Sequence, residues 1–167
     1  MAPAPSQSLT IRSAQRGDVQ LIVQLIRELA EYEREPDTAV ATKEDLLRDG
    51  FDSPTPLFQC LIAEWDRDPA GFAFFFTNYS TWHGRAGIHL EDLFVRAHLR
   101  GRGIGKALLK AVAREAVERG CTRLSWHVLD WNQPAITFYE HLGAEILQDW
   151  RICRVTRDGI AALAGES

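Results

Sequence analysis

The stretch RGRGIGKALL, residues 100–109, places a glycine at every second position and then a lysine ahead of an apolar run. Glycines at this spacing let backbone N–H groups approach an anion closely, and a helix that starts beside them adds the positive end of its dipole. Arg100, Arg102 and Lys106 add positive charge. The stretch is typical of a phosphate-binding loop, although a glycine-rich turn before an ordinary amphipathic helix has the same pattern.

Two familiar nucleotide-binding motifs do not fit this stretch. A Walker A loop requires GxxxxGK followed by Ser or Thr, but its first glycine position is Arg100 and its last position is Ala107. A dinucleotide-binding loop requires GxGxxG, and its third glycine position is Lys106. What remains is Arg100-x-x-Gly103-x-Gly105, between a predicted strand and a predicted helix.

The hydrophobic pattern around the loop predicts one α/β domain over residues 9–160, with short tails at 1–8 and 161–167. Apolar residues recur with the period of a strand in some segments and of a helix in others, and Thr42 and Asn132 are typical helix N-caps. The first four strands are expected to be antiparallel, and the strand–helix–strand run that follows implies a parallel crossover. We expect strands at 9–14, 57–64, 71–77, 89–95, 122–128, 145–147 and 151–156, and helices at 19–33, 43–49, 104–118 and 133–142.

Composition excludes several classes of protein. The chain has 167 residues, 46% of them hydrophobic and 25% charged, as expected for a globular protein. A net charge of −4 disfavours nucleic-acid binding. The sequence lacks the run of about 18 apolar residues that a membrane span needs, and MAPAPSQS at the N-terminus lacks the features of a signal peptide. We therefore expect neither a nucleic-acid partner nor a membrane partner.

Cysteine and histidine usage points to a reducing compartment and no metal. The three cysteines, Cys60, Cys121 and Cys153, are odd in number, widely spaced and without a CxxC pair. We expect buried free thiols and a cytoplasmic protein. The five histidines show no HExxH or similar ligand spacing, so no metal site is predicted.

The segment ELAEYEREPD, residues 28–37, carries five acidic residues and one arginine. Such a cluster fits a solvated helix end. It also fits a wall that attracts a cationic ligand, because clustered charges of one sign raise the local concentration of the opposite charge. The sequence alone leaves both interpretations open.

The loop Arg100-x-x-Gly103-x-Gly105 resembles the Q/R-x-x-G-x-G/A loop of the GNAT superfamily of N-acetyltransferases. The segments LIRELAEYE, EDLLRDGF, LEDLFV, RGRGIGKALL and WNQPAITFYEHLGA, in this order, are similar to the diamine acetyltransferase family. That family includes spermidine/spermine and thialysine N-acetyltransferases, and the similarity extends from about Leu9 to Val155. It implies the GNAT fold, a mixed and mostly antiparallel sheet with a parallel splayed strand pair and flanking helices. It also implies acetyl-CoA as cosubstrate, a small cationic amine as acceptor, and a homodimer.

Acetyl transfer to an amine by direct attack in a ternary complex needs a base and an acid. The pKa of an alkylamine is near ~10.4, so a base must remove its proton, and the thiolate of CoA must gain one. Period two places Glu91 with Leu93 and Val95 on one side of a predicted central strand and Asp92 on the other. Burial there would raise the pKa of Glu91 and make it a better base, whereas a wet strand end is the alternative interpretation.

The resemblance assigns the remaining roles. Glu91 would contact the amine, directly or through water, and Tyr139 would be the general acid, although a structural tyrosine beside Phe138 fits the pattern too. Tyr32 and Glu33 would contact the amine with Asp92 and Trp150, and Trp150 could equally be a core residue. Acetyl-CoA would be bound by Leu93, Phe94, Val95, Arg100, Gly101, Arg102, Gly103, Ile104, Gly105, Lys106, Asn132, Pro134 and Ala135.

One residue departs from the family pattern. The family carries an aspartate two residues before a tryptophan that corresponds to Trp82, and this chain has Ser80 there. The loss of an acid disfavours a long polycation such as spermine and favours thialysine or another lysine-like amine. A protein or peptide acetyltransferase and a non-catalytic acyl-CoA-binding module are the alternative functions.

Overall fold

The computed structural model describes residues 8–165, so residues 1–7 and 166–167 of the two predicted tails lie outside the described residues. The chain forms two compact units, one that ends at His127 and one that begins at Val128. One domain over residues 9–160 stays a prediction.

The first unit is built on a five-stranded sheet in the order β1-β2-β3-β4-β5. The first four strands are antiparallel neighbours and β5 is parallel to β4, which confirms the mixed α/β sheet expected from the sequence. The parallel pair is short, because β5 has only two residues. The sequence predicted seven residues for this strand. The strands are β1 (Leu9–Ser13), β2 (Gln59–Trp65), β3 (Asp68–Ser80), β4 (Arg85–Val95) and β5 (Leu124–Ser125).

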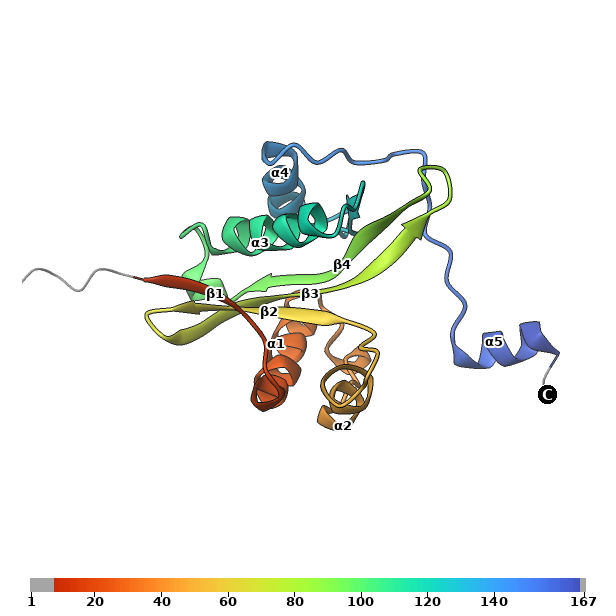
Figure 1. Ribbon diagram of the computed structural model, residues 1–167, viewed down its shortest axis with the longest axis horizontal. Helices are drawn as coiled ribbons and strands as arrows, with labels where there is room; N and C mark the ends of the chain where they lie inside the picture. The colour runs from red at the N-terminus through yellow and green to blue at the C-terminus, as the bar shows by residue number, and fades with distance from the viewer. Residues whose placement is uncertain (1–7, 166–167) are drawn as a thin grey trace, which may run out of the picture. The chain divides into compact units, whose positions relative to one another are not determined.

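Three α-helices flank this sheet, α1 (Val19–Tyr32) and α2 (Lys43–Leu46) on one face and α3 (Ile104–Glu118) on the other (Figure 1). The predicted N-cap of α2 is confirmed, because the Thr42 hydroxyl accepts a hydrogen bond from the backbone N–H of Asp45. In return, the Asp45 carboxylate accepts one from the backbone N–H of Thr42. Short helical turns lie at Arg16–Asp18, Pro36–Thr38, Leu47–Phe51 and Ala97–Leu99.

The aromatic strand β3 separates two apolar layers. Phe72 and Phe74 belong to the layer beneath α1, whereas Ala73 and Phe75 point to the α3 side, since successive strand residues alternate between faces. Arg119, at the end of α3, lies 5.7 Å from the Phe75 ring centroid. The buried layer on the α1 face consists of Val19, Ile22, Val23, Leu25, Leu29, Leu46, Cys60, Ile62, Phe72 and Phe94.

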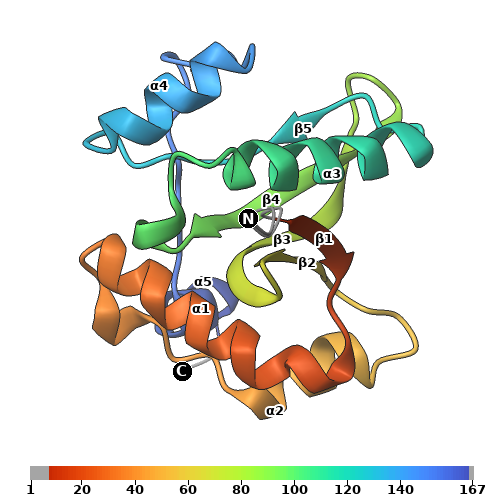
Figure 2. The ribbon, with the colours of Figure 1, turned by 90° about the vertical axis from the view of Figure 1, so that its left-hand side faces the viewer.

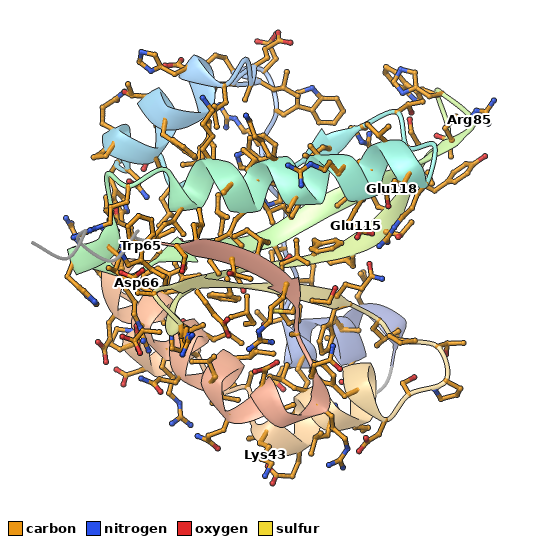
Figure 3. All side chains as sticks on the ribbon, turned by 60° about the vertical axis from the view of Figure 1, so that its left-hand side comes forward. Lys43, Trp65, Asp66, Arg85, Glu115 and Glu118 are labelled. Carbon is orange, nitrogen blue, oxygen red and sulfur yellow. The ribbon has the colours of Figure 1, made fainter. Side chains whose placement is uncertain are left out.

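Helix α3 runs along the sheet from one end to the other (Figure 2). It begins at the end where Trp65 and Asp66 close β2, and its last turns, with Glu115 and Glu118, lie toward the end that carries Arg85 and the β3–β4 hairpin (Figure 3). Its buried residues are Ile104, Leu108, Leu109, Val112 and Ala116. The residue range predicted for this helix, 104–118, is confirmed. No helix within residues 8–165 has the length and apolarity that a membrane span would need.

The second unit contains α4 (Gln133–His141) and α5 (Arg157–Ala164). The N-cap predicted at Asn132 is confirmed, because its side chain accepts a hydrogen bond from the backbone N–H of Ala135 at 3.4 Å. The helix α5 was not predicted. It crosses residue 160 and continues into the segment expected to be a C-terminal tail.

Two predicted strands are wrong, because residues 145–147 and 151–156 form no strand in the described part of the chain. Alternating apolar residues show that a segment has an apolar face, but a strand also needs an edge with which to form backbone hydrogen bonds. Among the cysteines, Cys60 is buried as predicted, whereas Cys153 is exposed and its predicted burial is wrong.

Candidate active site

The loop between Val95 of β4 and Ile104 of α3 has the geometry of an anion cradle. Gly101 and Gly103 adopt φ angles of 77° and 80°, in the left-handed region that favours glycine, and a Cβ at either position would meet nothing within 4 Å. Gly103 is the N-cap of α3, and its carbonyl accepts from the backbone N–H of Ala107. The glycines therefore serve the backbone conformation and leave an open surface at a helix N-terminus. The role predicted for this surface, binding a pyrophosphate, stays a prediction.

The two arginines of the loop turn in different directions. The Arg100 guanidinium carbon lies 4.2 Å from the centroid of the Tyr32 ring, and Arg100 Nε donates to the Val95 carbonyl at 2.9 Å. The Arg102 guanidinium carbon lies instead 5.3 Å from the centroid of Trp65, at the end of β2. Arg100 thus joins the loop to the end of α1, and Arg102 faces the sheet end labelled in Figure 3.

A β-bulge in β4 separates the two adjacent carboxylates. Phe74 pairs with Asp92 and Phe75 pairs with Leu90, which leaves Glu91 without an opposite residue on β3. An extra residue of this kind shifts the alternation of the bulged strand by one. Asp92 therefore shares the α1 face of the sheet with Phe74, and Leu90 shares the α3 face with Phe75.

Asp92 is half-buried and is the less exposed of the two carboxyls. Burial, followed by the negative charges of Glu91 and Glu33, raises the pKa of Asp92 to about 7. The Glu91 side chain is 55% exposed. The predicted burial of Glu91 is therefore wrong. Glu91, the extra residue of the bulge, is exposed, and the residue with the raised pKa is its neighbour Asp92.

A third carboxylate comes from the end of α1. Glu33 is the C-cap of this helix, and its backbone N–H donates to the Leu29 carbonyl. Burial raises the pKa of Glu33, and its charge acts on Asp92 across the sheet face. Two of the residues predicted to contact an amine, Glu33 and Glu91, therefore act electrostatically on a third, Asp92, in the first unit.

His89 lies beside Glu91, although its sequence position predicted no role for it. Its Nε2 atom is 3.7 Å from Glu91 Oε2, and its ring centroid lies 5.0 Å from that of His127 and 5.2 Å from that of Phe76. Burial, together with the nearby charge of His127, lowers the pKa of His89. The i, i+2 spacing of His89 and Glu91 was the available signal, since such residues lie near each other along a strand. Within residues 8–165, no His, Cys, Asp and Glu side chains gather into a group of three that could hold a metal ion.

Five predicted site residues lie in the second unit. Asn132 is buried at the N-cap of α4, with Pro134 in the first helical turn and Ala135 donating to Asn132. Tyr139 is buried in α4, 5.2 Å from Phe138 between ring centroids. Trp150 is 72% exposed, as a core residue would not be. The roles of these residues in catalysis and binding stay predictions.

An antiparallel sheet with one parallel crossover, a bulged strand and a glycine-rich loop at a helix N-terminus defines the fold class of the N-acetyltransferases. Comparison with known proteins agrees, since the profile of the Acetyltransferase (GNAT) family matches residues 22–144. The chain belongs to this family and is an acetyl-CoA-dependent N-acetyltransferase.

Named relatives cover most of the chain. It is 41% identical over 167 residues to the thialysine N-epsilon-acetyltransferase of Bos taurus, a match that spans 93% of this chain and 97% of the relative. It is 37% identical to the spermidine/spermine N(1)-acetyltransferase-like protein 1 of Homo sapiens, over 93% of this chain and 24% of that protein. Among solved structures, an integron cassette protein from V. cholerae is 27% identical, with a TM-score of 0.78 over 94% of this chain and 98% of the other.

Proposed function

We propose that this enzyme transfers acetyl from acetyl-CoA to a primary amine of a small cationic substrate, a thialysine- or lysine-like amino acid or a diamine. The observation that carries the proposal is the carboxylate group Glu33, Glu91 and Asp92, which gives the site a negative field suited to a cation. The relatives named for thialysine and for spermidine/spermine, both small cationic amines, support the same class.

The proposed chemistry is direct attack of the amine on the acetyl thioester that acetyl-CoA supplies. A carboxylate of the bulged strand, Asp92 or Glu91, takes the proton of the substrate ammonium, and the amine nitrogen then forms the new C–N bond. Backbone N–H groups of residues 93–95 stabilise the developing negative charge on the carbonyl oxygen. As the C–S bond breaks, the Tyr139 hydroxyl gives its proton to the leaving sulfur, and the second proton, which the nitrogen loses on becoming the amide, restores that hydroxyl.

The raised pKa makes Asp92 the better placed base of the two. A general base is most effective when its pKa lies near the working pH, and the pKa of Asp92 is about 7. Glu91, which is exposed and 3.7 Å from His89 Nε2, is then the residue that holds the cation. This assigns to Asp92 the proton transfer expected from the sequence at Glu91.

The environment of Ser80 supports a short amine. Ser80 is buried, and its hydroxyl lies 3.1 Å from His83 Nδ1 and accepts from the His83 backbone N–H at 3.3 Å. This side chain is engaged within the β3–β4 hairpin and brings no charge that could bind a distant ammonium group. We propose that the acceptor carries its charges close together, as thialysine, lysine and putrescine do.

Steady-state kinetics with acetyl-CoA test this proposal. The amines are thialysine, lysine, putrescine, spermidine, spermine and a lysine-containing peptide, and the assay measures the release of the CoA thiol. We expect kcat/KM to be highest for thialysine or another short amine. A preference for spermine would overturn the substrate class. Acetylation of the peptide alone would instead favour a protein acetyltransferase, and binding of CoA without thiol release from any amine would favour a non-catalytic module.

We also propose a cytoplasmic homodimer. The odd number of unpaired cysteines supports a reducing compartment, and resemblance to dimeric acetyltransferases supports the assembly. Light scattering after size-exclusion chromatography tests the second point, because a homodimer has twice the 18.8 kDa mass of the chain. A single monomer peak at the concentrations used for kinetics would contradict it.

A further inference from the structure

Arg100 belongs to the phosphate loop by sequence, but its side chain is directed toward the end of α1. Its guanidinium carbon lies 4.2 Å from the centroid of the Tyr32 ring and 5.7 Å from that of Phe94. Its Nε atom donates to the Val95 carbonyl at 2.9 Å. One side chain of the loop therefore contacts the last residue of α1 and the last two residues of β4 at once.

The geometry suits arginine and no other cation. A planar guanidinium can stack on an aromatic face and donate a hydrogen bond from its edge at the same time. A lysine ammonium is a compact charge without this plane, and it is more strongly hydrated. The contact thus depends on the shape of the Arg100 side chain as well as on its charge.

Arg102 provides a contrast within the same loop. It is two residues away, carries the same charge, and stacks at 5.3 Å on Trp65 at the end of β2, not on the end of α1. Both arginines add positive charge near the open glycine cradle. Only Arg100 connects this cradle to the helix end that carries Tyr32 and Glu33.

We propose that Arg100 is a positioning residue of the amine site, which holds Tyr32, and with it Glu33, against β4. This inference rests on the proposed function, in which Tyr32 and Glu33 contact the amine. Glu33 directly follows Tyr32 and acts electrostatically on Asp92. Fixing the ring of Tyr32 therefore fixes the end of α1 relative to the carboxylates of the bulged strand.

The sign of the charge effect separates positioning from simple electrostatics. Arg100→Ala removes a positive charge, and on charge alone this change lowers the KM of a cationic amine. Loss of positioning raises the same KM. For acetyl-CoA, whose phosphates are negative, loss of charge raises the dissociation constant in Arg100→Ala and in Arg102→Ala alike. The amine KM is therefore the measurement that distinguishes the two arginines.

The experiment compares Arg100→Ala, Arg100→Lys and Arg102→Ala in steady-state kinetics with the best amine of the panel, and measures CoA binding by calorimetry. We expect Arg100→Ala to raise the amine KM roughly fivefold or more, and Arg100→Lys not to restore it. Arg102→Ala should weaken CoA binding without raising the amine KM. Equal effects of the two alanine variants on the amine KM would overturn the proposal.

Tyr32 variants test the same contact from the other side. Tyr32→Phe keeps the aromatic face, so Arg100→Ala should still raise the amine KM in that background, whereas in a Tyr32→Ala background it should add nothing. Melting temperatures of Arg100→Ala, Tyr32→Ala and the double variant give a readout that needs no activity. A double variant less destabilised than the sum of the single ones supports the contact, and additive losses overturn it. If the wild-type enzyme acetylates no amine, the proposed function is wrong. The melting temperatures still test the contact between Arg100 and Tyr32 in that case.

Discussion

At the residue scale, the two adjacent carboxyls of β4 occupy different environments. Asp92 lies opposite Phe74 on the sheet face beneath α1, whereas Glu91, the extra residue of the bulge, is exposed. Transfer of a carboxylate out of water disfavours its charged form, and two further negative charges, on Glu91 and Glu33, add to this effect. Backbone geometry thereby creates a group that gains and loses its proton near neutral pH.

Asp92→Asn should change the pH dependence of both stability and catalysis. In the wild type, Asp92 binds its proton up to about pH 7 when folded but only up to about pH 4 when unfolded. The folded state thus holds the extra proton, and the free energy of unfolding falls as the pH rises through this window. We expect urea denaturation from pH 4 to pH 8 to show this decline, and Asp92→Asn to remove its part of it.

The same variant should lose the rise of kcat/KM with pH that a base with a pKa of about 7 produces. Glu91→Gln is the matched control, because it removes the neighbouring carboxylate from an exposed position. We expect Glu91→Gln to raise the amine KM and to keep the rising profile. A rising profile that survives in Asp92→Asn and disappears in Glu91→Gln would reverse the two assignments.

Tyr139→Phe tests the proposed acid. The substitution keeps the ring beside Phe138 and the backbone carbonyl that accepts from the N–H groups of Leu142 and Ala144. Only the hydroxyl is lost, so kcat should fall by about 100-fold or more. Calorimetry should find an unchanged affinity for CoA. Full turnover in this variant would refute the role of Tyr139.

At the scale of elements, the glycine-rich loop at residues 100–106 and the start of α3 form one structural unit. Gly101 and Gly103 turn the backbone through left-handed conformations, and the helix begins at once with the bond from Ala107 to Gly103. The first buried residue of α3, Ile104, follows directly and anchors the helix on the sheet. The apolar face of α3 therefore sets where its N-terminus presents its N–H groups.

Gly103→Ala should weaken acetyl-CoA binding through the backbone. At φ 80° an L-residue is strained by roughly 1–2 kcal/mol, although a Cβ would meet no atom within 4 Å. We expect a lower melting temperature and a higher dissociation constant for CoA. Gly17→Ala is the matched control, since its Cβ would also meet nothing within 4 Å and its φ is not in the left-handed region. Equal behaviour of the two variants would show that the left-handed conformation has no role.

At the scale of the whole molecule, the first unit is held together by contacts between segments that are distant in sequence. Arg96, directly after β4, donates to both carboxylate oxygens of Glu28 on α1 at 2.9 and 2.8 Å, and to the Pro69 carbonyl of β3 at 2.8 Å. One side chain thus joins a helix and two strands. The pairing lowers the pKa of Glu28, chiefly through the hydrogen bonds from Arg96.

Arg96→Ala should destabilise the protein by roughly 1–3 kcal/mol, because the partly buried Glu28 carboxylate loses its partner. A double-mutant cycle with Glu28→Ala, measured by urea denaturation, should show coupling at neutral pH. Since the folded pKa of Glu28 is lowered, this coupling is present above the ordinary pKa of glutamate and is lost as the pH falls below it. The exposed pair Arg16–Asp52, also bound by two hydrogen bonds, is the control and should contribute less. Equal losses in both pairs would contradict the importance of burial.

Local signals in the sequence determined several elements of this molecule. The span of α3 follows from its helical period and its flanking glycines, and the N-caps at Thr42 and Asn132 follow from the preference of these side chains for helix starts. The loop at residues 100–106 and the family it indicates could be read directly, because the conformations that it needs are available chiefly to glycine.

Contacts between distant segments determined the features that the sequence could not predict. The bulge at Glu91 exists only in the register between β4 and β3, and residues 145–147 and 151–156 form no strand in the described chain. Arg100 was read as a phosphate ligand from its position, but its contact with Tyr32 depends on α1 lying beside the loop. Local conformation depends on neighbouring residues. The register of a strand, the burial of a side chain and its stacking partner depend on residues that are far away in the sequence.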